Sequence, residues 1–273
     1  MKIHSIEPGP ISFVPHLSAA PGGGMRKSGL PLLRGWVSGM PKQLEALFVA
    51  SDLQGRDLSG QRLLGEAVAE HLVSLASAAV IPATDRIGIL LCGDLYAKPD
   101  PVKRGGLGDV GSVWAAFAEH FRWVLGVLGN HDILDPGSLA PFANKAQVLD
   151  GNESHRDGLV LAGVSGIVGD PKRPNRKSEE KYLEHLLKAL NHTPDILVIH
   201  PCPWVEGPEY AGLRTQRGGE GTLLDAVGLA ENLLVTCGHM HWENPVAKIS
   251  EGVQILNVDG RGVLLLPIPD ERI

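Results

Sequence analysis

One pattern constrains this 273-residue chain more than any other: a short apolar run that stops directly at side chains able to bind metal. Continuous apolar runs of four to six residues, bounded by Gly, Asp or His, are typical of strands buried on both faces of a sheet. The pattern occurs at residues 47–50, 87–92, 123–128, 196–199 and 233–236. Since the runs recur along the chain, their ends have the chance to meet at one edge.

Helical segments separate these strands. Residues 61–80 carry Leu64, Val68 and Leu72 at helical spacing, and further helices are predicted at 112–120, with Ser112 as cap, at 178–191 and at 222–231. Strands are also predicted at 159–168, 253–258 and 263–266, the last two joined as a hairpin by the turn signal at 259–262. The alternation predicts an α/β fold with two packed mixed β-sheets flanked by helices.

The first 45 residues are rich in Pro and Gly and lack a sustained period. They are interpreted as an N-terminal extension, residues 1–45, packed on one domain of residues 46–273. A strand is expected in it at 11–14 or at 33–37. A chain of this length still fits a single core.

Composition excludes several classes of protein. With 43% hydrophobic residues the chain is not disordered, and a net charge of −6 argues against a general nucleic-acid footprint. Prolines and glycines interrupt the uncharged stretch at residues 8–25, so neither a membrane span nor a signal peptide is predicted. Three cysteines cannot form a disulfide framework, and their odd number favours a reducing compartment. We expect a cytoplasmic protein without membrane contact, with Cys92 and Cys237 as small core residues.

The strand ends pool carboxylates, amides and imidazoles. The five ends are Asp52-Leu53-Gln54, Gly93-Asp94, Gly129-Asn130-His131-Asp132, His200 and Gly238-His239-Met240-His241. Ligands gather beyond the carboxyl ends of strands in α/β sheets, and mixed O and N donors suit divalent ions. The donors outnumber the needs of one ion, so two ions are predicted, with Asp94 as a bridge. Taken singly, Asp52 and Asp94 could be helix caps, Asn130 a turn residue and His200 a core histidine.

The order of these motifs resembles that of the calcineurin-like metallophosphoesterases, over residues 52–241. The resemblance implies a four-layer sandwich and a binuclear site. It implies that Asp52, position 54, Asp94 and His241 hold one metal. It also implies that Asp94, Asn130, His200 and His239 hold the other, that His131 faces the phosphate, and that Asp132 orients His131.

The function expected is hydrolysis of a phosphomonoester or phosphodiester by a metal-bound hydroxide, with His131 as acid or transition-state stabiliser. The substrate would be a phosphorylated small molecule or a nucleotide. A nuclease acting on short or single-stranded nucleic acid is the alternative, although the charge gives it little support. A non-catalytic metal-binding module of the same fold is an alternative of another class. The oligomeric state is left open.

Gln54 departs from the family pattern, which has His at this position. An amide oxygen can still ligate, with a preference for harder ions, so Mn²⁺ is the expected metal and Mg²⁺, Fe or Zn²⁺ are alternatives. A water in place of Gln54, or loss of activity, are the other interpretations. Arg56, the loop 98–111 and the basic loop 172–177 are candidates for substrate contact, each weighed against a purely surface position.

Overall fold

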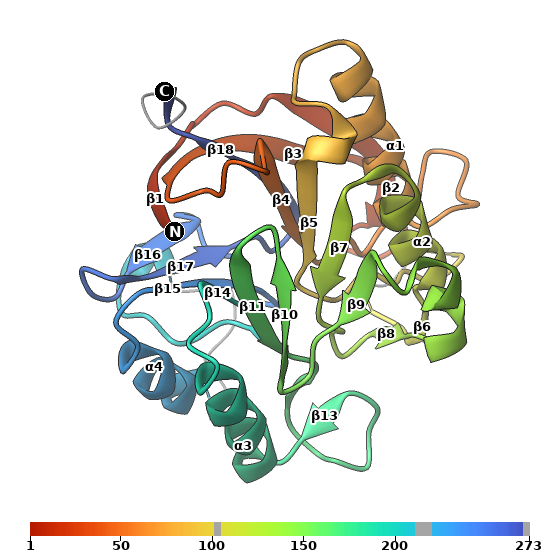
Figure 1. The fold of residues 1–273 in the computed structure, drawn as a ribbon. Coiled ribbons are helices and arrows are strands. Elements are labelled where there is room, and N and C mark those ends of the chain that lie inside the picture. The colour runs from red at the N-terminus through yellow and green to blue at the C-terminus, as the bar shows by residue number, and fades with distance from the viewer. Residues whose placement is uncertain (101–104, 211–219, 270–273) are drawn as a thin grey trace.

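The structure is a computed structural model that describes residues 1–100, 105–210 and 220–269. It is a mixed α/β fold with several sheets and few helices (Figure 1). The α/β class expected from the alternation of strands and helices is confirmed at this level.

The first sheet runs in the order β1-β3-β18-β4-β5-β7-β9, and β2 pairs with the N-terminal part of β3. Strands β4, β5 and β7 are parallel, so their carboxyl ends lie at one edge. The strands are β1 (Lys2–Ile6), β2 (Ser12–Ala19), β3 (Met25–Ser38), β4 (Ala46–Ser51), β5 (Ile87–Leu91), β7 (Trp123–Gly126), β9 (Ala146–Val148) and β18 (Arg261–Pro267).

The second sheet runs in the order β10-β11-β14-β15-β17-β16. Its strands β11, β14, β15 and β17 are parallel, and β10 and β16 join antiparallel at its two sides. The strands are β10 (Asn152–Arg156), β11 (Leu159–Val164), β14 (Ile196–Pro201), β15 (Leu233–Gly238), β16 (Val246–Lys248) and β17 (Val253–Asn257). Two small ladders pair β6 (Gly108–Asp109) with β8 (Asp132–Ile133), and β12 (Ile167–Val168) with β13 (Arg176–Lys177).

Apolar side chains fill three regions. Helices α1 (Leu64–Ser77) and α2 (Gly111–His120) bury Val68, Leu72 and Phe117 against the first sheet. Side chains of both sheets, such as Val49 and Val198, form one cluster, so the sheets share a core. Helices α3 (Glu179–Leu190) and α4 (Glu220–Gly228) cover the second sheet (Figure 1). The short 3₁₀ helices are η1 (Thr84–Arg86), η2 (Pro136–Phe142) and η3 (Pro208–Tyr210).

Two local predictions are corrected. Strands β17 and β18 are not a hairpin: β17 pairs with β15 in the second sheet, and β18 pairs with β3 and β4 in the first. Both strands are buried along nearly their whole length, and an isolated hairpin could not cover both faces of such strands. Ser112 does not cap α2, because the N-cap is Val110 and the Ser112 hydroxyl donates to Glu66 at 2.9 Å.

The N-terminal 45 residues supply three strands of the first sheet, more than the single short strand expected. Strand β3 lies second in the strand order of the sheet, where Leu32 to Val37 pair in parallel with β18. Several of the Pro and Gly residues lie inside the strands, among them Pro15 in β2 and Pro31 and Gly35 in β3, which explains why no clear period was visible.

Cys202 and Cys237 form a disulfide between the ends of β14 and β15. The sequence did not predict this pairing, because Cys237 was interpreted as a core thiol. Cys92 remains a free buried thiol, so the odd cysteine count reflects one disulfide and one core residue. It no longer indicates a reducing compartment. Within the described residues, no helix combines the length and apolarity that a bilayer crossing requires.

Candidate metal centre

The two sheets bring their carboxyl edges together at one place. The backbone N–H of Asp52 donates to the carbonyl of Gly93 at 2.9 Å, which joins the ends of β4 and β5. His200, on β14, donates through Nδ1 to the carbonyl of Cys92 at 2.7 Å and so ties the second sheet to the first. The strand ends predicted to converge therefore do so, since parallel strands in both sheets point the same way.

The loops at this edge adopt an uncommon backbone conformation. Asp52 and Asp94 each have φ of 55°, and His239 has φ of 69°. Positive φ is costly for a residue with a side chain and persists where surrounding contacts fix it, most often at functional sites. Gly129 is required beside them, because a Cβ there would lie 2.1 Å from Asp94 Oδ1.

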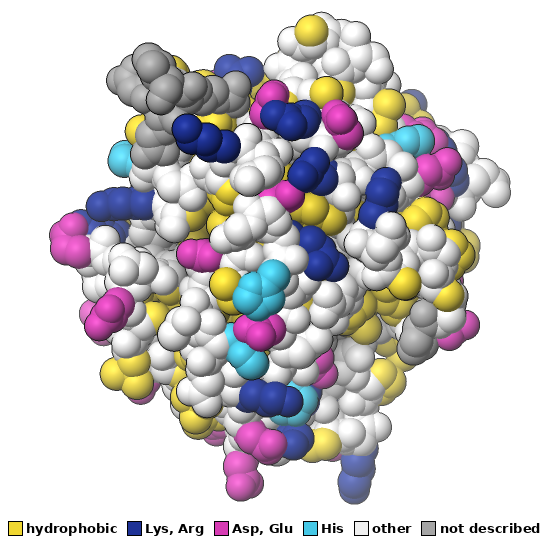
Figure 2. Space-filling view, viewed as in Figure 1, with side chains coloured by type: hydrophobic (Ala, Val, Ile, Leu, Met, Phe, Trp, Pro, Cys, Tyr) yellow, Lys and Arg dark blue, Asp and Glu magenta, His cyan; other side chains and the backbone are white. Residues whose placement is uncertain are grey.

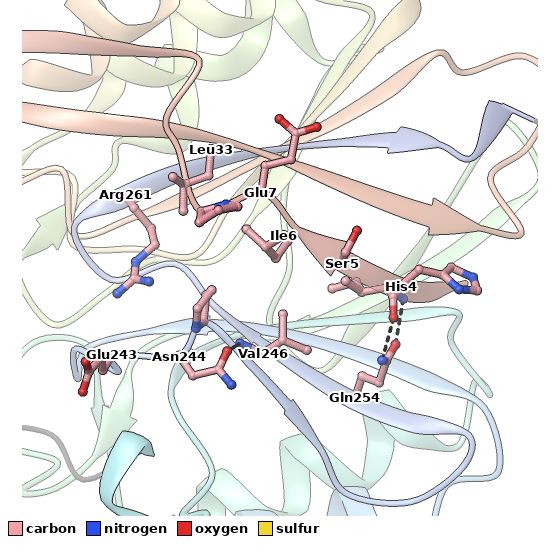
Figure 3. A pocket seen from close by; sticks show the side chains of 13 residues that line it. His4, Ser5, Ile6, Glu7, Leu33, Glu243, Asn244, Val246, Gln254 and Arg261 are labelled. Carbon is pink, nitrogen blue, oxygen red and sulfur yellow. Dashed lines mark hydrogen bonds between the residues drawn. The ribbon is translucent and has the colours of Figure 1, made fainter.

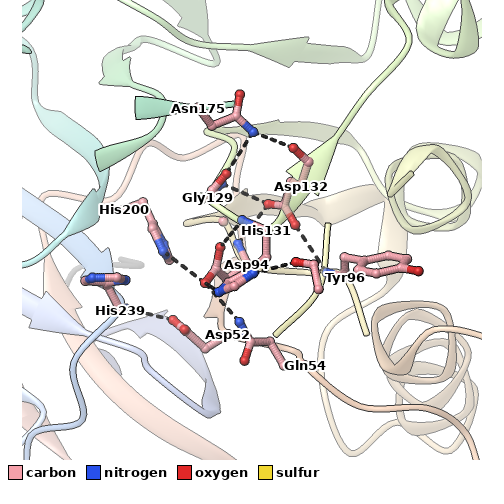
Figure 4. A network of polar contacts seen from close by, with 12 residues as sticks. Asp52, Gln54, Asp94, Tyr96, Gly129, His131, Asp132, Asn175, His200 and His239 are labelled. Atoms are coloured by element: carbon pink, nitrogen blue, oxygen red, sulfur yellow. Dashed lines mark hydrogen bonds and ion pairs between the residues drawn. The ribbon is translucent and has the colours of Figure 1, made fainter. Parts of the chain in front are cut away.

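Asp94, His200 and His239 form a group whose ligand atoms all lie within 4.8 Å of one another. Asp94 and His200 are buried, and His200 Nε2 lies 3.3 Å from Asp94 Oδ2. The rings of His200 and His239 meet edge to face with centroids 4.9 Å apart. Figure 4 shows the three side chains pointing toward a common point between the two sheets. A buried Asp/His/His group of this kind could bind a metal ion.

The charges in this group are strongly coupled. Burial alone would lower the pKa of His200, but the adjacent Asp94 carboxylate outweighs it and raises the pKa to about 10. Burial would raise the pKa of Asp94, but His200 holds it at about 2. In the metal-free protein a proton on His200 therefore compensates the buried carboxylate. A metal ion would take the place of that proton, because a ligating imidazole must be deprotonated.

Asp52 and Gln54 extend the group from the end of β4. Asp52 Oδ2 accepts the backbone N–H of His239 at 2.8 Å and the Ser51 hydroxyl at 2.8 Å. Burial, and next the Asp259 carboxylate, raise the pKa of Asp52 well above its ordinary value. Gln54 donates its side-chain amide to Asp94 Oδ2 at 2.9 Å. Both residues thus lie within direct contact of the other predicted ligands.

Two buried side-chain atoms of the predicted ligands have no hydrogen-bond partner. They are Asn130 Oδ1 and His200 Nε2, and both belong to the set predicted to hold one metal. His200 Nε2 keeps an ionic contact with Asp94 Oδ2 at 3.3 Å, whereas Asn130 Oδ1 is a buried acceptor without a partner, which costs free energy and needs a reason, such as an ion. The donor set of carboxylate, amide oxygen and imidazoles fits a divalent transition metal. By this test, the residues fit the metal that the sequence predicts.

His131 lies beside the group without belonging to it. Its Nδ1 faces the carbonyl of Gly106 and so must be the donor, which leaves Nε2 directed to the centre, 3.8 Å from Asp94 Oδ2. Its backbone N–H donates to Asp94 Oδ1 at 3.0 Å. The residues 105–108 of the loop after Asp94 therefore lie against His131. Lys103 and Arg104 of the same loop lie outside the described residues.

Asp132 holds the loops rather than the His131 ring. Its carboxylate accepts backbone N–H groups from Asp94 at 2.8 Å, Leu95 at 2.7 Å, Tyr96 at 3.2 Å and Gly129 at 2.8 Å. Burial, and next Asp94, raise its pKa to about 6, against the effect of these donors.

Asn175 supports the turn that carries Gly129 and Asp132. Its amide donates to the carbonyls of Gly129 and Asp132 (Figure 4). Sequence reasoning missed Asn175, because it lies in a charged loop far along the chain and only the tertiary fold brings it to the turn.

His241 lies apart from the group, beside Arg261. The Arg261 guanidinium contacts the His241 ring at 3.0 Å and donates to the carbonyl of Trp242. Arg261 also lines a cavity of about 550 Å³ between β1, β3 and β16 (Figure 3). The structure thus assembles the second predicted ligand set more completely than the first.

Two further candidates for substrate contact, Arg56 and the basic loop 172–177, make contacts within the protein. Arg56 is buried and donates to the carbonyls of Gln61, Ala97 and Lys98, so its side chain braces loops. In the basic loop, Lys177 pairs with Asp150 at 3.1 Å.

Three of the histidines without a predicted role pair with acidic side chains at the margin of the second sheet. They are His155 and His192 with Glu153, and His185 with Asp150. Figure 2 shows histidine, acidic and basic side chains side by side on this face. Ion pairs at a surface account for these histidines without a ligand.

No protein-family model matches the chain, and no curated protein matches it. Three solved structures resemble it in outline. A phosphopantetheinyl hydrolase from Mycobacterium tuberculosis is 15% identical, over 83% of this chain and 90% of that one, with a TM-score of 0.42. A hypothetical protein from Thermus thermophilus is 16% identical, over 78% and 75%, with a TM-score of 0.40. A 5′-nucleotidase from Candida albicans is 11% identical, over 81% and 46%, with a TM-score of 0.38. Likenesses this weak carry no argument about function.

Proposed function

We propose that this protein is a metal-dependent phosphoesterase with the four-layer architecture of the calcineurin-like metallophosphoesterases. The observation that carries the proposal is the buried group of Asp94, His200 and His239, together with the unbonded Oδ1 of Asn130, whose chain neighbour His131 donates its backbone N–H to Asp94. These residues lie at the ends of different strands. They meet because the carboxyl edges of the two sheets lie together. The ordered motifs of the sequence and the convergence of their side chains support the same interpretation.

Two ions are proposed at this edge. Asp94, Asn130, His200 and His239 would hold one, and Asp52, Gln54, Asp94 and His241 would hold the other. Divalent ions supply polarisation of phosphoryl oxygens and activation of water near neutral pH. Mn²⁺ is proposed because the amide oxygens of Gln54 and Asn130 favour a harder ion than a thiolate or all-imidazole site would.

His131 would act on the substrate directly. Its Nδ1–H is committed to the carbonyl of Gly106, so Nε2 is held toward the centre. When Nε2 is also protonated, the ring can donate that proton to the leaving oxygen of the ester or a hydrogen bond to the phosphoryl group. Asp132 would contribute by fixing the loops that carry Asp94 and Gly129, and with them the position of His131.

The test is turnover of p-nitrophenyl phosphate and bis-p-nitrophenyl phosphate by protein stripped of metal and then supplied with Mn²⁺. We expect turnover that requires Mn²⁺ and is lost in Asn130→Ala and His131→Ala. Preference for one ester assigns the protein as a monoesterase or a diesterase. Cleavage of a short oligonucleotide in place of both esters would favour the nuclease alternative. Metal binding without turnover of any ester would favour a non-catalytic module.

A further inference from the structure

The long hairpin of β2 and β3 changes character along one face. In its register Val14 pairs with Leu30, His16 with Ser28, and Ser18 with Arg26. Alternate residues of a strand share a face, so all six side chains lie on the same side of the hairpin. Val14 and Leu30 belong to the core under α1. The next two pairs, His16 with Ser28 and Ser18 with Arg26, are polar. Apolar side chains at these positions would instead have extended that core.

The polar part of this face stands opposite Asp52 and Gln54. Together they line a cavity of about 160 Å³, whose other walls include Leu64, Asp259 and Gly260. Polar groups within reach of the predicted metal ligands, but contributed by a different segment, are where a substrate's non-reacting part would be recognised. The cavity holds roughly five water molecules at ~30 Å³ each, which suits a small charged group.

The hairpin is fastened to the loop that carries Gln54. Leu17 N–H donates to the carbonyl of Arg56 at 2.7 Å, and Arg56 N–H donates to the carbonyl of Leu17 at 2.9 Å. Gly55 lets the hairpin approach, because a Cβ there would lie 2.7 Å from the His16 ring. The wall and the ligand loop thus form one unit with a fixed spacing.

The chemistry of this wall favours an anion. Arg26 supplies a guanidinium with five N–H donors, and the hydroxyls of Ser18 and Ser28 are 2.9 Å apart, each with capacity for a further bond. His16 Nδ1 contacts the carbonyl of Val14, which leaves its other ring nitrogen available. Guanidinium and hydroxyl groups together are typical of phosphate recognition. Apart from the His16 imidazole, the lining contains no aromatic ring on which a base could stack.

We infer that this cavity binds a second phosphate group of the substrate, so that the protein acts on small molecules that carry two phosphates. The inference rests on the proposed function. One phosphate is hydrolysed at the metal centre, and the other is held by Arg26, Ser18 and Ser28. Arg26 is then a specificity-determining residue.

The probes are α,ω-alkanediol bisphosphates of two to six carbons and their matched monophosphates, assayed by phosphate release with Mn²⁺ in excess over substrate. We expect kcat/KM to be about tenfold or more higher for the preferred bisphosphate than for its monophosphate. The optimal chain length measures the distance between the two phosphate positions. A short single-stranded oligonucleotide serves as the competing substrate class.

Arg26→Ala should abolish the preference for bisphosphates and leave turnover of p-nitrophenyl phosphate unchanged. Lys27→Ala is the matched control, since Lys27 carries the same charge on the same strand but faces the other way. Equal kcat/KM for bisphosphates and monophosphates, or equal losses in Arg26→Ala and Lys27→Ala, would overturn the inference. Cleavage of the oligonucleotide that depends on Arg26, without any preference for bisphosphates, would also overturn it.

If the wild-type protein with Mn²⁺ turns over no ester at all, the proposed function fails on its own. Calorimetric binding of the same compounds with Mn²⁺ still decides the inference in that case. Tighter binding of a bisphosphate than of its monophosphate, lost in Arg26→Ala and kept in Lys27→Ala, would support the second phosphate site. Equal binding would reject it.

Discussion

The side-chain amide of Gln54 donates a hydrogen bond to Asp94 Oδ2 across 2.9 Å. This contact joins Gln54 to the carboxylate proposed to bridge two ions. A His at the same position could offer a ring nitrogen to a metal directly, whereas Gln54 in the metal-free protein uses its N–H₂ group on the bridge. The identity of residue 54 should therefore set the strength and the metal preference of one of the two positions.

Gln54→His should strengthen binding at that position and shift it toward Zn²⁺. Imidazole is a better ligand than an amide oxygen for Zn²⁺, so we expect the ratio of Zn²⁺ to Mn²⁺ affinity to rise on the order of tenfold, about 1.4 kcal/mol. Metal analysis and competition calorimetry measure it. Gln61→His, at an exposed position in the same segment, controls for a general effect of an added histidine. An unchanged ratio would mean that residue 54 does not contact metal.

Asn130→Ala should separate stability from metal binding. Asn130 Oδ1 is buried without a partner, so its removal should change the metal-free free energy of unfolding by less than about 1 kcal/mol. Mn²⁺ at 100 times its dissociation constant should stabilise the wild type by about 2.7 kcal/mol. The variant should lose about half of this gain or more, because loss of a ligand weakens affinity by at least about 10- to 100-fold. Denaturant unfolding without and with Mn²⁺ gives the metal-free free energy of unfolding and the stabilisation that Mn²⁺ adds. Asn191→Ala, on the surface, is the control. A large loss of metal-free stability would assign Asn130 a structural role.

His131→Ala should reduce kcat and leave the metal content unchanged. His131 lies beside the ligand group but has its Nδ1 engaged with Gly106, so its loss removes a proton donor and no ligand. The expected decrease is about 10²- to 10⁴-fold in kcat. His155→Ala, whose side chain is 68% exposed, should match the wild type. A parallel loss of metal from His131→Ala would instead place His131 among the ligands.

The parts of this structure that could be predicted are those encoded by short-range pattern. The apolar runs and the residues that end them predicted strands β4, β5, β14 and β15 and the meeting of Asp94, His200 and His239. Strands β2 and β3 are harder to predict, because polar and small residues alternate in them. Strand β2 pairs with β3, and the register of β3 depends in turn on its pairing with the distant β18.

The separation of β17 from β18 could not be predicted for a related reason. The turn signal at 259–262 is local, but which sheet each strand joins depends on the apolar faces that need cover. Asn175, Arg26 and the Cys202–Cys237 disulfide are likewise recognisable only when distant segments meet. Local pattern thus predicted which side chains meet at the candidate site, and tertiary pairing determined the residues that support them.

Asp157→Asn should lower stability in a manner that depends on pH. Asp157 accepts from Arg122 at 2.7 and 2.6 Å and from Trp123 Nε1 at 2.7 Å, which joins the turn after β10 to the first sheet. The Arg122 hydrogen bonds are the main reason that the pKa of Asp157 lies below its ordinary value, against a smaller opposing effect of burial. The folded state therefore holds the proton less tightly than the unfolded state. The stability that the ionised Asp157 carboxylate contributes is present at neutral pH. It is lost as the pH falls below about 4, through the pKa of Asp157 in the folded state.

We expect the variant to lose about 1.5–3 kcal/mol at pH 7, toward the lower value because Arg122 is partly exposed. The gap to the wild type should narrow as the pH is lowered below about 4, and urea unfolding across this range measures it. Asp225→Asn, on the exposed side of α4, should show no such trend. A gap that is constant with pH would mean that the ionised form of Asp157 contributes nothing.

The Cys202–Cys237 disulfide should support both the fold and the centre. It closes a segment with a sequence separation of 35, for which chain entropy gives roughly 3–4 kcal/mol of stabilisation. A double Cys202→Ala, Cys237→Ala variant should be less stable by about that amount, and reductant should bring the wild type to the same value while leaving the variant unchanged. Cys92→Ala, which removes the free buried thiol, should keep the response to reductant. Because Cys202 lies two residues after His200, and Cys237 two before His239, reduction should also weaken Mn²⁺ binding. Stability that falls on reduction while Mn²⁺ affinity stays constant would show that the disulfide supports the second sheet without positioning the histidines.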